Sequence, residues 1–529
     1  MFDFLIRGGT VVDGTGKAGY RADVAVKDGK IAKIAPEITQ PAGQVIDANG
    51  RYVTPGFIDI HRHADVNLFL PTFGEAELRQ GLTTIVNGNC GLSVVPCPKK
   101  YRAEIYRFLQ PVIGEVNAPH EFSTMEEYLA LAEQMPLPLN VGMDIGDGTV
   151  RAAVKGYEPG DLTAEEWNAA REYLRSSLAA GALGVTLGIV YAPENCYDAD
   201  GFVKVLQPIK EFGVPLVTHI RGEGDLFHES LREVIDIARR LDVPLHISHL
   251  KCIGKRNWGH GVKKALDILR QARESGMDVS YDVYPYTAGS TQLIQILPPE
   301  YLEGGVEEMV KRLTDPKKRA ELTTILKEPQ DYFENLVSSI GWENIRMSTL
   351  TLPKNQQYVG KSVAEIASMQ GKDPYDCAYD MLAEEQCKIS MVDFITSEED
   401  ICTILRDPYS SVISDSVYPT GGVPHPRLYG TFPRVLEKYV REEKVLTLEQ
   451  AIHKMTALPA SVYHLKKGRL QEGADADINV FALENVHTAA TYEDPKQFAV
   501  GFDYVLVNGQ IAVDHDKMTH QSAGRLRRR

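Results

Sequence analysis

The central part of the chain alternates strand-like runs with helix-like runs, and this alternation constrains the fold more than any other feature of the sequence. Helix-like stretches separate mostly apolar runs at 83–87, 139–143, 182–186, 214–219, 244–249 and 277–282. Counted from 52–60 to 411–415, the strand-like runs number about eight. Alternating strands and helices predict a parallel sheet, so we expect an α/β fold built on a (β/α)8 barrel, the TIM barrel.

The two ends of the chain lack this alternation and contain short strand-like runs separated by turns. Asp-Gly pairs at 13–14 and 28–29 indicate hairpins, and similar strand-like runs return at 476–481 and 504–513. A few strands alone bury too little apolar surface to be stable. We therefore expect the two ends to form one small β-sandwich domain together.

The expected domain boundaries follow from these patterns. Residues 1–54 and 466–529 are assigned to the small β domain, and residues 55–465 to the barrel. From about 299 to 343 a helical stretch rich in both acidic and basic residues interrupts the alternation. We interpret this stretch as an inserted subdomain.

Charge and composition exclude several classes of function. The formal net charge is −15, from 57 Lys and Arg against 72 Asp and Glu, which disfavours binding to nucleic acid or to an anionic membrane. No apolar run approaches the roughly 18 residues of a membrane span. The start of the chain lacks the pattern of a signal peptide, and the seven scattered cysteines suggest reduced thiols. We therefore expect a cytoplasmic protein that acts on a small molecule.

Side chains that can bind a metal ion follow several of the strand-like runs. Two histidines stand one residue apart after the run at 52–60, and positions i and i+2 of an extended chain point to the same side. The carboxyl ends of barrel strands share one face, where active sites are built. The candidates at this face are His61, His63, Cys90, His219, His249 and Asp415.

Each candidate has an ordinary explanation when it is considered alone. A histidine can be satisfied in the core, a cysteine can be a small buried hydrophobic residue, and an aspartate can cap a helix. Together they match a one- or two-metal hydrolase, in which a metal-bound water becomes a nucleophile near neutral pH. Cysteine among the ligands favours zinc, because thiolate and imidazole both suit this ion.

Longer motifs carry a family resemblance. The string Gly-Phe-Ile-Asp-Ile-His-Arg-His at 56–63, with the later strand-end histidines and aspartate, resembles the amidohydrolase superfamily. The strings at five further places resemble one branch of this superfamily, the N-acyl-D-amino-acid deacylases (D-aminoacylases). These strings lie at 88–93, 248–252, 257–259, 282–291 and 425–434. The resemblance covers nearly the whole chain.

The resemblance implies a function and a role for each site residue. It implies zinc-dependent hydrolysis of the amide bond of N-acyl-D-amino acids, which releases a carboxylate such as acetate and a free D-amino acid. The implied ligands of a tightly bound zinc are Cys90, His219 and His249, with a second, weaker metal position near His61 and His63. Asp415 is the implied proton shuttle. The implied substrate-binding residues are Lys251, Tyr191, Tyr284 and Ser290, and a lysine with phenols suits an α-carboxylate.

Two positions depart from the pattern of the branch. Asp147 stands where the branch usually has a histidine, and Ser416 stands where a glycine commonly follows the aspartate of the last strand. Asp147 cannot replace a histidine as a metal ligand or as a neutral hydrogen-bond donor in the same way. The departure bears on the second metal and on the contact to the scissile amide, and it leaves the Cys-His-His set intact.

Two other functions compete with this interpretation. A cyclic amidase of the hydantoinase or dihydropyrimidinase type shares the barrel and the His-x-His motif, but it bridges two metals with a carboxylated lysine at the end of strand 4. The run at 181–191 contains no lysine, and Cys90 offers an alternative bridge. A non-enzymatic scaffold would be expected to have lost metal ligands, and none of the expected ligands is missing.

The stretch 291–298 bears on the side chain of the substrate. It contains no Arg or Lys and is mostly apolar, whereas an acidic side chain would need a cation in its pocket. We expect a preference for neutral, apolar side chains such as those of D-Met, D-Leu or D-Phe over D-Glu and D-Asp. A distant arginine, Arg62 or Arg427 for example, could reach the pocket and change this expectation.

Overall fold

The structure, a computed structural model, describes residues 1–116 and 122–529. Its centre is a barrel of almost entirely buried strands that pair in parallel. In chain order these strands are β6 (Phe57–Asp59), β7 (Leu82–Asn87), β8 (Asn140–Met143) with its continuation β9 (Ile145–Gly146), β10 (Val185–Gly188), β11 (Leu216–His219), β12 (Leu245–Ile247), β13 (Val279–Val283) and β17 (Ser410–Val412). The N–H of Asp415 donates to the carbonyl of His61 at 3.0 Å, which brings the last strand against the first.

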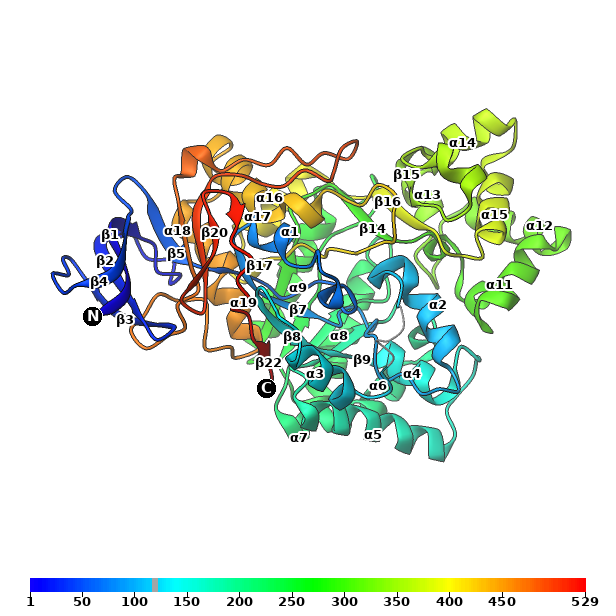
Figure 1. The fold of residues 1–529 in the computed structure, drawn as a ribbon. Helices are drawn as coiled ribbons and strands as arrows, with labels where there is room; N and C mark the ends of the chain where they lie inside the picture. The colour runs from blue at the N-terminus through cyan, green and yellow to red at the C-terminus, as the bar shows by residue number, and fades with distance from the viewer. Residues whose placement is uncertain (117–121) are drawn as a thin grey trace.

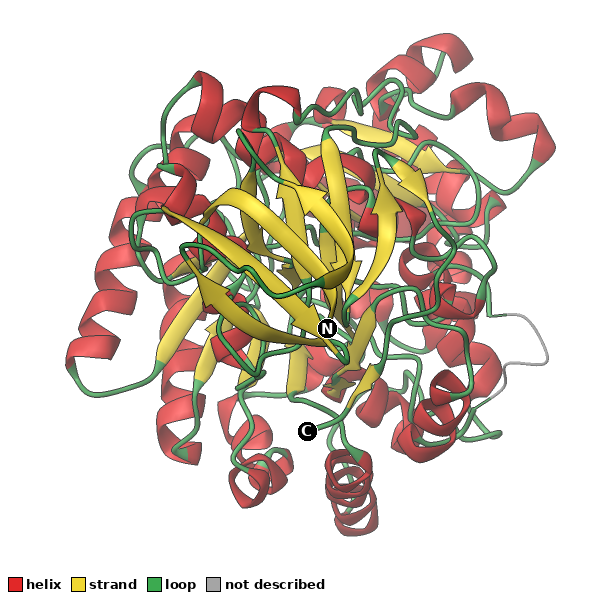
Figure 2. Ribbon diagram, turned by 60° about the vertical axis from the view of Figure 1, so that its left-hand side comes forward, coloured by secondary structure: helices red, strands yellow, loops and turns green. Residues whose placement is uncertain are grey.

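Helices surround the barrel on its outer side (Figure 2). They include α3 (Met125–Glu133), α4 (Asp147–Lys155), α5 (Ala164–Ala180), α7 (Gln207–Phe212), α8 (Phe227–Leu241), α9 (Gly261–Glu274), α16 (Glu398–Arg406) and α18 (Leu448–Met455). Thr163 and Glu166 start α5 with a capping box, and Gly181 ends it with a φ of 116°, which favours glycine. Among the described residues, no helix is long and apolar enough to cross a lipid bilayer.

The two ends of the chain form one nine-stranded sheet beside the barrel, where Figure 1 shows the blue and red segments side by side. Its strands are β1 (Phe2–Val11), β2 (Tyr20–Lys27), β3 (Lys30–Ala35), β4 (Ala42–Asp47), β5 (Tyr52–Pro55), β18 (Ile478–Phe481), β19 (Phe502–Val507), β20 (Gln510–Asp514) and β21 (Lys517–Met518). Antiparallel pairing of β5 with β18 joins the two ends. The predicted fold class, a TIM-like barrel with a small β domain from both ends, is confirmed.

The run at 52–60 is divided between these two parts, although its apolar character predicted one continuous strand. β5 belongs to the nine-stranded sheet, and β6 begins the barrel. Gly56 separates them, and a Cβ at this position would lie 2.3 Å from the side chain of Thr83. The close approach of β7 requires glycine here, and the chain turns from one sheet into the other.

An inserted segment leaves the barrel after β13 and returns before β17. Its β14 (Ala288–Gln292), β15 (Ile345–Thr349) and β16 (Ser390–Phe394) form a three-stranded antiparallel sheet. The predicted insertion at about 299–343 falls in the helices between β14 and β15, which are α10 (Pro299–Leu302), α11 (Gly305–Thr314), α12 (Pro316–Leu326) and α13 (Leu336–Ile340). Figure 1 shows them at the end of the molecule remote from the N-terminus.

Candidate active site

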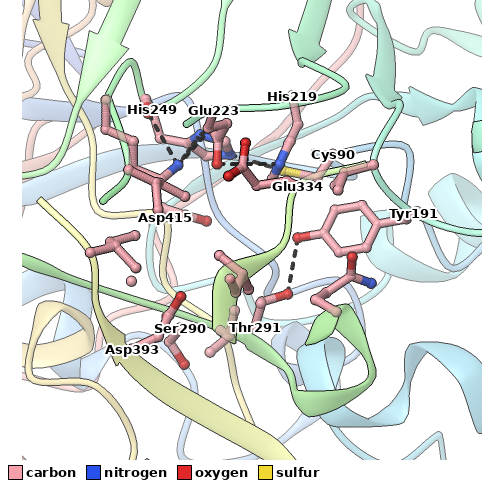
Figure 3. Close-up of a pocket in the computed structure, with 18 of the residues that line it drawn as sticks. Cys90, Tyr191, His219, Glu223, His249, Ser290, Thr291, Glu334, Asp393 and Asp415 are labelled. Carbon is pink, nitrogen blue, oxygen red and sulfur yellow. Dashed lines mark hydrogen bonds and ion pairs between the residues drawn. The ribbon is translucent and has the colours of Figure 1, made fainter. Parts of the chain in front are cut away.

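The predicted site residues meet in one open cavity at the carboxyl ends of the barrel strands, where the space, together with the solvent at its mouth, is about 690 Å³. His61 lies deeper, against Cys90. The other predicted residues line the cavity, and these are His63, Cys90, Tyr191, His219, His249, Lys251, Tyr284, Ser290 and Asp415. The inserted segment supplies the wall that contains Ser290. Figure 3 shows this wall across the cavity from the histidines.

Cys90 is the centre of the candidate metal ligands. Its Sγ lies 3.2 Å from Nε2 of His61 and 3.5 Å from Nε2 of His249. Three sets of buried side chains have ligand atoms within 4.8 Å of one another, and they are His61 with His63 and Cys90, Cys90 with His219 and His249, and His61 with His249 and Asp415. Cys90 belongs to two of these sets, so it is placed to serve two neighbouring metal positions.

Burial and neighbouring charges shift the pKa values of Cys90 and of the histidines around it. Burial alone would raise the pKa of the Cys90 thiol, but the neighbouring His61 and His249 hold it well below its usual value. Burial lowers the pKa of His219 and so favours the neutral imidazole. Burial and Lys251 oppose protonation of His249, but Glu223 and Cys90 raise its pKa to about 9. Metal binding requires a thiolate and neutral imidazoles, so the folded chain favours the required form at Cys90 and His219, and a metal ion has to displace a proton at His249.

Three of the site residues have a left-handed backbone that non-glycine residues seldom adopt. The φ angles are 55° at Cys90, 35° at His249 and 51° at Asp415. Such conformations cost free energy and concentrate at functional sites, where the surrounding fold enforces them. They occur just after β7, β12 and β17, where the chain turns from strand to loop and the side chain lines the cavity.

Asp415 lies between two histidines and an arginine. Its Oδ1 is 3.4 Å from Nε2 of both His61 and His63, and its Oδ2 is 3.0 Å from Arg427. Burial opposes ionisation, but Arg427 and His61 lower the pKa of Asp415 well below its usual value. Asp415 is therefore an ionised carboxylate beside the candidate metal ligands.

Glu223 is a site residue that the sequence motifs do not predict. Its Oε1 accepts a hydrogen bond from Nζ of Lys251 at 2.7 Å and lies 3.1 Å from Nδ1 of His249. Its Oε2 lies 3.5 Å from Nε2 of His219. Burial opposes ionisation, but Lys251 and the two histidines lower the pKa of Glu223. The only sequence signal was its position four residues after a predicted metal ligand at a strand end.

The remaining predicted substrate residues lie on the cavity wall in hydrogen bonds or packing contacts with the chain. The hydroxyl groups of Tyr191 and Thr291 are 2.9 Å apart. Ser290 donates its hydroxyl to a backbone carbonyl of β16 at 2.8 Å. The ring of Tyr284 lies 4.7 Å from the guanidinium carbon of Arg427 and 5.8 Å from Nζ of Lys251. This part of the site is therefore polar and partly cationic.

Neither of the two arginines considered from the sequence lines the cavity. Arg62 is fully buried and pairs with Glu77 at 2.7 Å and with Asp59 at 3.1 Å. Arg427 pairs with Asp415. Among the described residues, Lys251 is the one Lys or Arg in the cavity lining.

Asp147, the position of the expected histidine, does not line the cavity either. It begins α4 and is fully buried, and neither carboxylate oxygen has a hydrogen-bond partner in the described part of the chain. Burial raises the pKa of Asp147 to about 7. Burial also raises the pKa of Glu194, and the nearby carboxyl group of Asp147 raises it further. The structure therefore places Asp147 with a second buried carboxyl group.

Comparison with known proteins agrees with this geometry. A family model described as "Amidohydrolase family" matches residues 44–513. The chain is 32% identical to a D-aminoacylase of Alcaligenes xylosoxydans xylosoxydans over 99% of this chain and 97% of that protein. It is 34% identical to an N-acyl-D-glutamate deacylase of the same organism, over 99% of this chain and 96% of that protein.

Solved structures give the same result. A crystal structure of D-aminoacylase superposes with a TM-score of 0.83 at 32% identity, covering all of both chains. N-acyl-D-glutamate deacylase from Bordetella bronchiseptica, complexed with zinc and a phosphonate inhibitor, superposes with a TM-score of 0.84 at 32% identity, again over both whole chains. An L-hydantoinase from Arthrobacter aurescens reaches a TM-score of 0.58 at 16% identity, which shows the fold alone. The chain therefore belongs to the amidohydrolase family, in its D-aminoacylase branch.

Proposed function

We propose that the protein hydrolyses the amide bond of N-acyl-D-amino acids, with zinc as its metal, and releases a carboxylate and a free D-amino acid. The observation that carries this proposal is the set of ligand atoms of Cys90, His219 and His249, which lie within 4.8 Å of one another beside the ionised Asp415. The hydantoinase alternative is less well supported, because its relatives share only the fold with this chain.

The side chains present fit a zinc ion. One thiolate and two imidazoles are ligands that zinc prefers. Nδ1 of His63 and of His219 are buried and have no hydrogen-bond partner in residues 1–116 and 122–529. Unpaired buried nitrogen atoms are costly, and a metal ion is a partner that would satisfy the site.

Each residue of the site has a separate role in the proposed reaction. A bound zinc would polarise the acyl carbonyl and lower the pKa of water. Asp415 takes the proton from the attacking water and then passes it to the nitrogen of the leaving amine, because base and acid duty alternate within one turnover. Arg427 stabilises the ionised form of Asp415. Lys251, Tyr191, Tyr284 and Ser290 bind and orient the substrate, whose α-carboxylate meets Lys251 and the tyrosines.

Two metal positions of unequal affinity fit the ligand sets. The set that contains Cys90, His219 and His249 holds the tighter metal, because a thiolate adds charge and softness to two imidazoles. The position near His61 and His63 holds a second, weaker metal. Asp147 lies outside the cavity, so no ligand from this position is expected.

The lining of the cavity supports a preference for neutral or apolar side chains over acidic ones. Its apolar part includes Leu92, Val112, Leu336 and Ile395. Among the described residues, Lys251 is the one Lys or Arg that lines the cavity, and it already pairs with Glu223. Sequence similarity does not favour one substrate side chain, because the relative at 32% identity is a D-aminoacylase and the relative at 34% identity is an N-acyl-D-glutamate deacylase.

A panel of N-acetyl-D- and N-acetyl-L-amino acids, assayed with zinc present, tests the proposed function. We expect hydrolysis of the D-isomers and a higher kcat/KM for N-acetyl-D-methionine than for N-acetyl-D-glutamate. Hydrolysis of L-isomers alone would reject the proposal. Turnover of hydantoin without any linear amide would favour the cyclic amidase, and a higher kcat/KM on N-acetyl-D-glutamate would reject the side-chain preference.

A further inference from the structure

One wall of the cavity comes from the inserted segment. Gly289, Ser290 and Thr291 of β14 line it, and Asp393 of β16 lies directly opposite Gly289 in the antiparallel pair. Residues opposite each other in such a pair point to the same face, so Asp393 reaches over the glycine into the cavity. Figure 3 shows Asp393 beside Ser290, across the cavity from His219.

Asp393 is a buried carboxyl group that forms no ion pair with the described residues. It is 4% exposed, and its Oδ1 has no hydrogen-bond partner among the described residues. A Cβ added at Gly289 would lie 3.1 Å from this oxygen and 3.3 Å from the hydroxyl oxygen of Tyr284, so the glycine keeps the space between them open. Burying a charge without a partner is costly, and folded proteins usually supply one. Inside a substrate cavity, the substrate can supply it.

The other charges around the cavity do not supply that partner. Lys251 pairs with Glu223 at 2.7 Å, and Asp415 pairs with Arg427 at 3.0 Å. Glu334, also from the inserted segment, lines the cavity and accepts a hydrogen bond from a backbone N–H at 2.7 Å. In the part of the chain that the structure describes, no Lys or Arg forms an ion pair with Glu334 or Asp393. The inserted wall therefore presents two carboxyl groups to the cavity, and neither is paired with a basic side chain of the described residues.

We propose that Asp393 forms a subsite for a positively charged group at the end of the substrate side chain, so that the preferred substrate is an N-acyl-D-amino acid with a basic side chain such as D-lysine. This inference rests on the proposed function and deepens it. The stem of a lysine side chain is apolar and suits Leu336 and Ile395, which line the same cavity. The ammonium group then forms a charge-assisted hydrogen bond with Asp393.

Three matched substrates separate the effect of charge from that of size. N-acetyl-D-norleucine has the carbon stem of lysine without the ammonium group, and Nα,Nε-diacetyl-D-lysine keeps the length and loses the charge. We expect kcat/KM for N-acetyl-D-lysine to exceed that for each neutral substrate by about tenfold or more, the usual effect of one hydrogen bond to a charged group. In Asp393→Asn this ratio should fall toward one.

A control variant and two outcomes make the test decisive. Glu399→Gln removes an exposed carboxylate of α16 outside the cavity and should leave the ratio unchanged. A wild-type ratio at or below one would overturn the inference, as would a high ratio that Asp393→Asn retains. Failure to hydrolyse any N-acetyl-D-amino acid would instead overturn the proposed function, and the inference with it.

The pH dependence of the same ratio needs no variant, so it remains informative if Asp393→Asn fails to fold. Burial raises the pKa of Asp393 to about 6, against the attraction of Lys251 and Arg427 and with a smaller repulsion from Glu223. Tyr284 also faces the group. The ammonium group of the lysine substrate stays protonated up to about pH 10. The pH dependence of kcat/KM reports the pKa values of groups in the free enzyme. The ratio should therefore fall as the pH drops through about 6 and Asp393 gains a proton. A ratio that stays constant from about pH 5 to 8 would overturn the inference.

Discussion

Asp415 combines three properties that a proton shuttle needs. It is buried beside the candidate metal ligands, it is ionised because Arg427 and the histidines stabilise its charge, and its left-handed backbone fixes where its carboxylate lies. Proton transfer by a positioned carboxylate depends on such geometry as well as on pKa. The sequence predicted Asp415 from its place after the last strand, and it did not predict that Arg427 would be the partner.

Replacing Asp415 by asparagine should abolish most of the activity and leave the site assembled. Asparagine has the same shape and cannot accept and return the proton, so kcat on N-acetyl-D-methionine should fall by about 10²–10⁴-fold. Zinc content and circular dichroism should match the wild type. Asp267→Asn, which alters an exposed carboxylate of α9, serves as the control and should keep full activity. More than about a tenth of the wild-type kcat in Asp415→Asn would exclude the assigned role.

Other residues of the site could not be predicted from the sequence for a physical reason. Histidines and a cysteine at strand ends have few other uses in such a pattern, so they stand out. Glu223, Glu334 and Asp393 are common residue types in ordinary local contexts. They reach the cavity only because the fold brings the loop after β11 and the inserted segment together. The run at 291–298 predicted an apolar pocket, whereas Asp393, which comes from a strand distant in the sequence, adds a carboxyl group to it.

The candidate metal site joins three separate barrel elements. Cys90 follows β7, His219 ends β11 and His249 follows β12, so the three ligands belong to different strands of the barrel. Parallel strands align their carboxyl ends, which is why residues far apart in the sequence converge here. A metal ion bound to all three would link the loops that follow these strands.

Removal of Cys90 should therefore empty the tighter metal position. Cys90→Ala, dialysed without added metal, should hold well below one equivalent of zinc, because the thiolate contributes charge and softness and belongs to two of the ligand sets. Cys196→Ala removes an exposed cysteine elsewhere and should retain the wild-type zinc content. Metal analysis of the two proteins gives the answer, and a full equivalent of zinc in Cys90→Ala would contradict the proposed order of affinity.

The sequence predicted elements best where a pattern repeats over many residues. The alternation of strands and helices predicted the barrel. The strand-like runs at both ends predicted one small β domain built from the two ends, which the pairing of β5 with β18 confirms. The strand break at Gly56 was not predicted, because the reason for it is the close approach of Thr83, a tertiary contact. The short strand β22 (Leu526–Arg527) has no periodicity that could have been recognised.

At the scale of the whole molecule, the C-terminal residues reach back to the barrel. The sequence pattern predicts that residues 466–529 belong to the small β domain, but β22 pairs in parallel with β8. Arg527 donates hydrogen bonds to three side chains, and its acceptors, at 2.9 to 3.0 Å, are Asn140, Asp475 and Asn508. These acceptors come from both the barrel and the small β domain, so the C-terminus holds the two parts against each other.

Deletion of residues 524–529 should therefore destabilise the protein without changing its substrate preference. Each lost hydrogen bond costs roughly 1 kcal/mol, so the loss of several should lower Tm by about 3 °C or more for a chain of this size. Alanine at Arg528 and Arg529, with β22 intact, is the matched control. Their hydrogen bonds to Ala180, Glu133 and Phe212 are exposed to solvent and contribute little, so this variant should lower Tm by less than the deletion does. None of these residues lines the cavity, so the ratio of kcat/KM between N-acetyl-D-lysine and N-acetyl-D-norleucine should stay at its wild-type value. An unchanged Tm would show that β22 is dispensable, and a changed ratio would show that the C-terminus acts on the cavity through the barrel.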